Sequence, residues 1–259
     1  MPFIDTPWLS SGVAVLAAIT LIFVLAGLIK GVIGLGLPTI AMGLLGVFMP
    51  PAQAATLLIV PSLVTNVQQM LNGGALRALL RRLWPMQVAV FIGTLWSPVS
   101  VATLDARVAS AGLGAALIVY AVLGLASIRF SVSARAQRWA SPVAGLITGV
   151  ITAATGVFVV PAAPYLQGLG LNKDELVQAL GLSFTVSTVA LCLRLAFDGS
   201  LMFGAVSVGW GLVLPLAAAL LGMAIGQKLR GKLGESAFKR VFFAGLLLVG
   251  LHLVFKGLL

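Results

Sequence analysis

The sequence carries one apolar octet twice. Residues 26–33 read AGLIKGVI and residues 144–151 read AGLITGVI, so that seven of eight positions agree at an offset of 118. Both copies run into helix-breaking patches, at 34–38 and 152–156. A duplicated membrane protein with helices broken at matching places is typical of transporters whose site lies at the breaks. The repeat therefore predicts two related halves and a central site.

The composition places the chain in lipid. Apolar residues make up 60% of the 259 residues and charged residues only 8%, against about 25% charged in a soluble domain. The first residues lack the basic region of a cleavable signal peptide. The single Cys192 and single His252 exclude an internal disulfide and a multi-histidine metal site.

Long apolar segments alternate with short ones in each half. A membrane span needs about 20 apolar residues, and three of the segments fall well short of that length, namely 38–49, 141–152 and 157–167. We predict that these three are re-entrant arms, whereas 12–33 is long enough to cross fully. The other long segments are 52–71, 84–103, 108–126, 175–196, 205–227 and 238–256.

The predicted fold is an all-α integral membrane protein of two inverted repeats, residues 1–128 and 129–259. Each repeat would hold a broken, re-entrant helix pair and three transmembrane helices. Beyond the octet, Gln53 matches Gln178 and Ser62 matches Ser187 at an offset of 125, and Gly93 matches Gly222 at an offset of 129. The drift in offset requires only short insertions at loops.

The net charge of +10 predicts orientation rather than nucleic-acid binding. Basic residues cluster in short loops at 77–82, 129–138 and 228–240, as in the positive-inside pattern of polytopic proteins. With these loops in the cytoplasm, the second half starts inside and ends outside, and the first half does the reverse. Both termini are then outside the cell, including Asp5 and Lys256.

The two breaks are the first candidates for binding. Arms that start at Thr39 and near Val157 would point free amides and the positive ends of helix dipoles at the centre, which favours an anion. The alternative is a pair of packing kinks without a ligand. The candidate residues at the breaks are Gly36, Pro38, Thr39, Thr152, Thr155, Gly156 and Val157.

Polar side chains inside the spans are the second candidates. Gln53, Ser62, Asn66 and Gln178 could bind an oxyanion without adding a fixed charge, although such groups also form ordinary hydrogen bonds between membrane helices. Lys30 stands inside the first octet, where the second copy has Thr148. An intramembrane charge is costly and usually functional, so Lys30 either faces the anion or extends to an interface.

The acidic residues all fall at predicted segment ends, so that a buried carboxylate proton relay has no candidate; they are Asp5, Asp105, Asp174, Glu175, Asp198 and Glu235. The chain also lacks a phosphate-binding loop of the P-loop type. We therefore expect no enzyme activity, no cofactor and no metal site. Transport would follow the gradient of the anion, the membrane potential, or an ion held by neutral oxygens.

The duplicated octet, each copy followed by a break, together with the Gly93 and Gly222 segments and the basic loop at 228–232, resembles the sulfite exporter TauE/SafE family, also called the 4-toluene sulfonate uptake permease family. The resemblance implies a bacterial inner-membrane protein that moves sulfite, sulfoacetate or other small organosulfonates. The two breaks here are less rich in glycine than is usual in the family.

The resulting hypothesis is a secondary transporter in which a small sulfonate or sulfite anion binds between the breaks and the halves rock about it. Its partners are this anion and the lipid bilayer, with no nucleic acid, and a homodimer stays an open alternative. Two rival functions also stay open: an anion channel, and a membrane accessory protein for cofactor or metal assembly.

Overall fold

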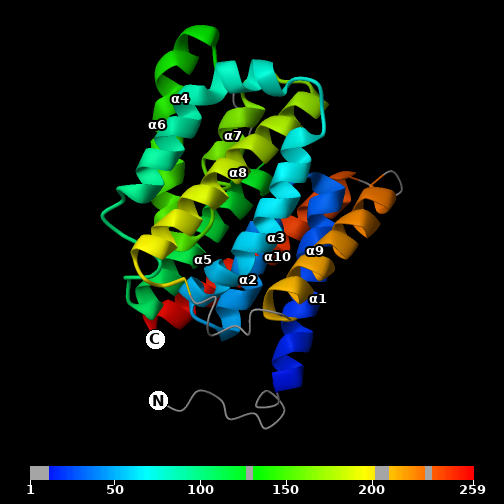
Figure 1. Cartoon of the computed structure of the whole chain (residues 1–259), viewed down its shortest axis with the longest axis vertical. Helices are drawn as coiled ribbons and strands as arrows, with labels where there is room; N and C mark the ends of the chain where they lie inside the picture. Colours follow the sequence, from blue (N-terminus) through cyan, green and yellow to red (C-terminus); the bar gives the residue numbers. More distant parts are fainter. Residues whose placement is uncertain (1–11, 127–130, 202–209, 231–234) are drawn as a thin grey trace.

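The protein is helical throughout the part of the chain described by the computed structural model, which covers residues 12–126, 131–201, 210–230 and 235–259 (Figure 1). Asp5, the boundary between the predicted repeats and the start of the predicted segment 205–227 lie outside these residues. The helices are α1 (Gly12–Ile33), α2 (Leu37–Phe48), α3 (Pro51–Leu71), α4 (Leu76–Leu95), α5 (Ala106–Leu125), α6 (Ala134–Thr155), α7 (Ala162–Gln167), α8 (Lys173–Phe197), α9 (Trp210–Leu229) and α10 (Glu235–Leu258).

Six of these helices are long and apolar enough to cross a membrane, namely α1, α3, α5, α8, α9 and α10. The predicted multi-pass membrane class is therefore confirmed. Helices α4 and α6 have 20 and 22 residues, but both begin with arginines, such as Arg77 and Arg135, that lower their mean hydropathy.

The first predicted break is present. Helix α1 ends at Ile33, and α2 begins at Leu37. Gly34 and Gly36 adopt φ values of 80° and 108°, which side chains with a Cβ rarely allow. Pro38 stands in the first turn of α2, where its missing N–H costs no helical hydrogen bond.

The second broken pair differs from the prediction in both arms. The segment predicted at 141–152 belongs to a helix that already begins at Ala134, because Ser133 caps it through Ala136 N (3.2 Å) and the residues that follow are mostly good helix formers. The segment predicted at 157–167 is helical only from Ala162. Pro161 explains the late start, since a proline disfavours helical backbone at the residue before it.

The two halves interlock through the glycines of the duplicated octet. A Cβ on Gly31 of α1 would lie 2.3 Å from Met223 O of α9, and a Cβ on Gly149 of α6 would lie 2.4 Å from Val90 O of α4. Gly222 approaches α1 in return, with Val24 O at 2.1 Å from such a Cβ. The octet is thus a packing motif that brings the first helix of each half against the fourth helix of the other.

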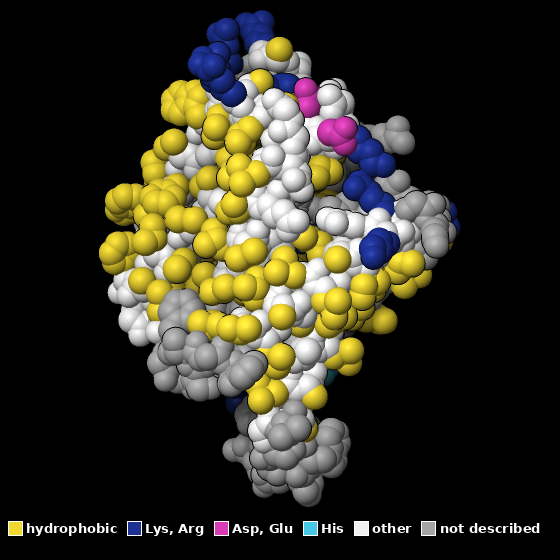
Figure 2. Space-filling view, turned by 45° about the vertical axis from the view of Figure 1, so that its right-hand side comes forward, with side chains coloured by type: hydrophobic (Ala, Val, Ile, Leu, Met, Phe, Trp, Pro, Cys, Tyr) yellow, Lys and Arg dark blue, Asp and Glu magenta, His cyan; other side chains and the backbone are white. Residues whose placement is uncertain are grey.

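The ends of the helices separate basic from apolar surface. In Figure 1 the α3–α4 turn, the start of α6, the start of α8 and the end of α9 lie at the upper end. Helix α1 begins and α10 ends toward the opposite end. On the face that Figure 2 shows, most Lys and Arg side chains lie at the upper end and the right side, and hydrophobic side chains spread over the surface below them. We call the basic end the inner end and the other the outer end.

Replacing Gly149 with alanine should destabilise the protein. The added methyl group would overlap Val90 O, and such overpacking costs about 1–3 kcal/mol. The melting temperature in detergent should fall by about 5 °C. Gly245→Ala is the matched control, because a Cβ on Gly245 meets no atom within 4 Å, and it should leave the melting temperature nearly unchanged. Equal melting temperatures for the two variants would contradict the packing role.

Candidate functional site

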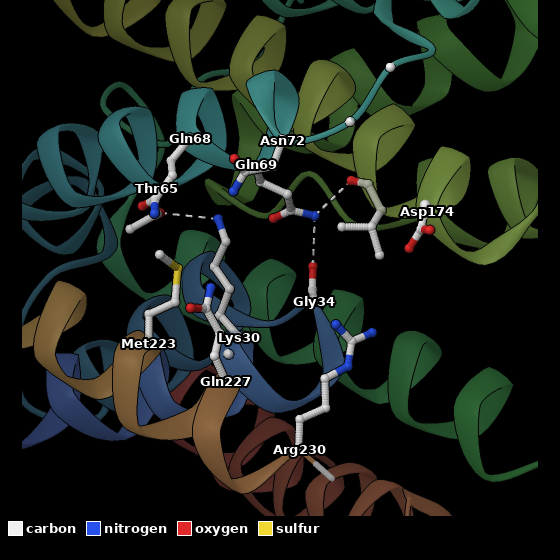
Figure 3. A pocket seen from close by; sticks show the side chains of 14 residues that line it. Lys30, Gly34, Thr65, Gln68, Gln69, Asn72, Asp174, Met223, Gln227 and Arg230 are labelled. Carbon is white, nitrogen blue, oxygen red and sulfur yellow. Dashed lines mark hydrogen bonds between the residues drawn. The ribbon is translucent and has the colours of Figure 1, made fainter.

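A cavity of about 470 Å³ opens at the inner end between α1, α3, α8 and α9 (Figure 3). Lys30 and Gly34 line it from α1 and the first break, and Thr65 and Gln69 line it from α3. The second half also contributes wall residues, namely Asp174, Val177, Met223, Gln227 and Arg230. The cavity is therefore built by both halves and lies beside the first break.

Lys30 is the buried charge at this cavity. Its residue is only 3% exposed, and its ammonium donates to Thr65 Oγ1 at 3.0 Å and to Asn66 Oδ1. Asn66 Nδ2 in turn donates to Thr188 Oγ1 of α8 at 3.3 Å. Within the described part of the chain no carboxylate bonds to the ammonium, so the oxygens that face its charge there belong to neutral side chains.

Gln69 ties the first break to α8. Its Nε2 donates to Gly34 O at 3.0 Å and to Val177 O at 2.9 Å. An unwound carbonyl at membrane depth needs such a partner, because lipid offers none. Gln69 therefore holds the break open on the cavity wall, and Figure 3 shows both hydrogen bonds beside Lys30.

The predicted residues of the first break lie close to the cavity but do not line it. Gly36, Pro38 and Thr39 are buried. The first hydrogen bond of α2 runs from Ile40 N to Gly36 O, so that the N–H groups of Leu37 and Thr39 have no partner within the helix. The helix itself therefore leaves these two N–H groups unused, and their role as anion ligands stays a prediction.

The second break is arranged differently, and the expectation that a helix begins near Val157 is wrong, whereas its role in binding stays a prediction. Val157 lies five residues before α7, and its N–H donates to Thr155 Oγ1 at 3.2 Å. Thr152 Oγ1 and Thr155 Oγ1 donate to carbonyls of their own helix, each at 2.7 Å. Gly156 ends α6 with φ 71°. None of these four residues lines the cavity.

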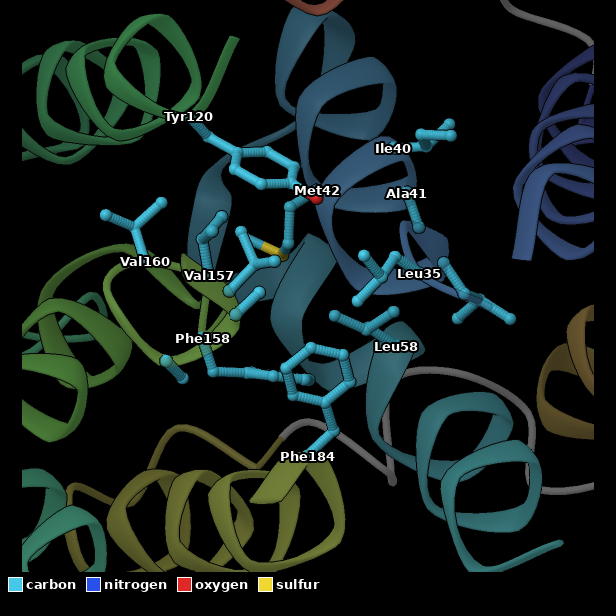
Figure 4. Close-up of a cluster of buried hydrophobic side chains, with 14 of the residues drawn as sticks. Leu35, Ile40, Ala41, Met42, Leu58, Tyr120, Val157, Phe158, Val160 and Phe184 are labelled. Carbon is cyan, nitrogen blue, oxygen red and sulfur yellow. The ribbon is translucent and has the colours of Figure 1, made fainter. Parts of the chain in front are cut away.

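Apolar side chains fill the space between the breaks (Figure 4). Leu35 and Met42 come from the first broken pair, and Phe158 comes from the second. The ring centroids of Phe158 and Phe184 are 5.3 Å apart, and a Cβ on Gly156 would lie 2.8 Å from Met42 Cε. These apolar side chains separate the two breaks, and none of those named here lines the cavity.

The remaining predicted residues divide into three environments. Gln178 of α8 is buried against the α3–α4 turn, where its Nε2 donates to Met70 O and Gly73 O and its Oε1 accepts from Ala75 N. Ser62 is fully buried, and its hydroxyl has no hydrogen-bond partner. Gln53 is exposed. Of the twelve predicted site residues, only Lys30 lines the cavity. Asn66 does not line it but accepts a hydrogen bond from the Lys30 ammonium.

The sequence did not single out the wall contributed by the second half. Met223, Gln227 and Arg230 stand on one side of α9, at spacings of four and three residues. Arg230 counted only as part of a basic loop, and Asp174 only as an acidic residue at a segment end. The spacing of Met223, Gln227 and Arg230 places them on one side of a helix. The sequence alone does not show that this side faces α1, so it could not identify them as cavity residues.

A bundle of apolar helices with a broken pair beside a polar cavity, and a charged side chain at that cavity, is typical of helical membrane transporters. The comparison with protein families makes this assignment specific. The model of the family described as sulfite exporter TauE/SafE matches residues 19–253. The chain belongs to this family of membrane transporters and is not an enzyme. No curated protein and no solved structure matches the chain.

Replacing Gln69 with leucine should loosen the first break. The carbonyl of Gly34 would lose its donor and that of Val177 the second of its two donors, and a buried group left without a partner costs about 1–3 kcal/mol. The melting temperature should fall measurably. Gln68→Leu is the matched control, because Gln68 also lines the cavity but is exposed; a loss as large as that of Gln69→Leu would argue against the role of Gln69.

Proposed function

We propose that this protein is a secondary transporter that carries sulfite or a small organosulfonate such as sulfoacetate, by alternating access around the cavity at Lys30. The observation that carries the proposal is the ammonium of Lys30, which is buried against neutral oxygens only. A buried charge without an opposite charge is expensive. A bound oxyanion would supply the missing charge.

The groups around Lys30 suit a sulfonate head. Its three oxygens accept hydrogen bonds and donate none, so they require several converging donors. The ammonium of Lys30 and the side-chain amides of Gln68 and Gln227 line the cavity, and a charge-assisted contact such as that of the ammonium is a strong one. The cavity volume of about 470 Å³ also leaves room for a short organic tail beside Met223 and Val177.

Two inverted repeats, residues 1–128 and 129–259, explain how the helices pair. Helix α1 packs on α9 as α6 packs on α4, and α3 packs on α8 and α5 on α10. In the two repeats α1 corresponds to α6, α3 to α8, α4 to α9 and α5 to α10. Exchanging corresponding helices turns the α1–α9 pair into the α6–α4 pair and leaves the α3–α8 and α5–α10 pairs unchanged. The same exchange is the basis of alternating access in transporters built from inverted repeats.

The inner end would face the cytoplasm of a bacterial cell and both termini the outside, in line with the positive-inside pattern. The cavity would then be open to the cytoplasm. The apolar side chains between the breaks, among them Phe158 and Phe184, favour a carrier over a channel, since an open pore would need a polar path at this point. The candidates Gly36, Pro38, Thr39, Thr152, Thr155, Gly156, Gln53, Ser62 and Gln178 stay predicted contacts along the transport route.

The role of Lys30 is tested by replacing it with methionine. Removal of an uncompensated charge and loss of the donor to Asn66 Oδ1 act on stability in opposite directions, so the melting temperature of the ligand-free protein should change little. Lys30→Met should also abolish the rise in melting temperature that sulfite or methanesulfonate produces in the parent protein. The affinity for the anion should fall by about 10- to 100-fold for one lost charge-assisted contact. Thermal shift with these two anions measures both effects.

Lys256→Met is the matched control for Lys30→Met. Lys256 is also a lysine in a candidate span, but its ammonium bonds Gly46 O at 3.1 Å and Val47 O at 2.7 Å at the end of α2. Its replacement should lower the melting temperature and leave the response to anions intact. A Lys30→Met protein that still binds both anions normally would overturn the proposed site.

A further inference from the structure

We propose that the outer end of the protein holds a second anion-binding station, with Arg194 as its cation, which is closed in this structure and opens when the cavity at Lys30 closes. This inference rests on the proposed function, because it uses the exchange of two inverted repeats. It assigns a binding role to a residue that does not line the cavity.

The repeat offsets identify what would line the outer station. At the offset of 125 that matches Ser62 with Ser187, the cavity residue Gln69 corresponds to Arg194. At the octet offset of 118, Lys30 corresponds to Thr148 and Gly34 corresponds to Thr152. If the halves exchange conformations, these counterparts form the wall of an outer cavity. Arg194 supplies its positive charge, because Thr148 is neutral where Lys30 is charged.

Arg194 is engaged by its neighbours in this structure. It stands near the outer end of α8, 20 residues beyond Asp174 and therefore about 30 Å along the helix from the cavity mouth. Its Nη1 donates to Leu95 O at 2.6 Å and to Ser97 O at 3.0 Å, just after α4. Arg194 thus fastens α8 to the end of α4. Thr148 and Thr152 of α6 are fully buried.

Asp198 occupies the place that an anion would take. Arg194 Nε donates to Asp198 Oδ2 at 3.1 Å, and Ser100 Oγ donates to the same oxygen. The carboxylate therefore sits among a guanidinium and a hydroxyl, which are donors that a sulfonate would also use. When α4 moves away from α8, Arg194 loses the two carbonyls and can exchange Asp198 for the transported anion.

The inner end shows the opposite arrangement. Asp174 and Arg230 flank the cavity from α8 and α9 (Figure 3) and form no ion pair with each other. Lys30 likewise lacks a carboxylate partner. One end thus offers an available cation and an open mouth, and the other a neutralised cation and a closed wall. This is the pattern expected when two equivalent sites are accessible in turn.

Cysteine accessibility tests the proposal directly. Cys192 is the only cysteine, so Cys192→Ser gives a cysteine-free parent for the single replacements Thr152→Cys at the outer station and Gln68→Cys at the inner cavity. A membrane-impermeant methanethiosulfonate reagent is added to intact cells for the outer position and to inside-out vesicles for the inner one. Methanesulfonate serves as the anion, because sulfite would attack the reagent and the label.

Adding Asp198→Asn should release Arg194 and shift the protein toward the outward-open form. Labelling of Thr152→Cys should become about tenfold faster, as expected for the loss of one charge-assisted contact, and labelling of Gln68→Cys should become slower. In the Asp198→Asn background, methanesulfonate should protect Thr152→Cys. This protection should disappear with Arg194→Gln and persist with Arg194→Lys, which identifies the anion contact.

The outcomes separate the two proposals. If methanesulfonate protects Gln68→Cys but Asp198→Asn leaves Thr152→Cys unreactive, the outer station is wrong and the inner site stands. Thr148→Cys repeats the measurement should Thr152→Cys fail to fold. Protection of Thr152→Cys that survives Arg194→Gln would overturn the role of Arg194. If methanesulfonate neither protects Gln68→Cys nor stabilises the parent protein, the proposed function itself fails.

Discussion

The structure depends on backbone-to-backbone contact between the first helix of each half and the fourth helix of the other. Glycines at equivalent places in the octets, Gly31 and Gly149, remove the side chains that would separate these helices. Such small-residue contacts are a main source of helix association in lipid, where the hydrophobic effect gives no net attraction between apolar helices. The contact with α9 places Lys30 opposite Met223 and Gln227, so the cavity follows from the same packing.

The second constraint is that lipid offers no hydrogen bonds to unwound backbone. At the first break, Gln69 supplies a donor to Gly34 O from a neighbouring helix. At the second break, Thr155 supplies an acceptor to Val157 N from the same chain segment. The first solution leaves a polar wall beside the break, whereas the second closes the break on itself. The cavity consequently lies on the side of the first break.

Sequence reasoning located the breaks better than the arms. Gly34 and Pro38 mark the first break locally, because positive φ and the loss of a donor are properties of single residues. The extent of α6 was underestimated, since only its apolar part was counted and the arginine-containing first turns are equally helical. The start of α7 was placed too early. The apolar residues 157–160 were counted as part of the helix, but Pro161 disfavours helical backbone at the residue before it.

The site was predictable only where one residue carries the signal. Lys30 is recognisable from its charge within an apolar octet, and Asn66 from its position in the middle of a span. The sequence could not predict what the hydroxyls of Thr152 and Thr155 bond to, because a threonine hydroxyl in a helix can donate to a carbonyl of its own helix. Both hydroxyls do so here. The walls from α8 and α9 depend on contacts between residues more than 100 positions apart.

The differences between the halves are as informative as the repeat. Packing positions such as Gly31 and Gly149 are kept, whereas the polar positions diverge from Lys30 to Thr148 and from Gln69 to Arg194. One fixed charge therefore stands at the cavity, on α1, and the other near the outer end of α8. Under the proposed mechanism, an anion crossing between them would meet a cation at each end and apolar side chains in the middle, and neither end would require two buried cations to face each other.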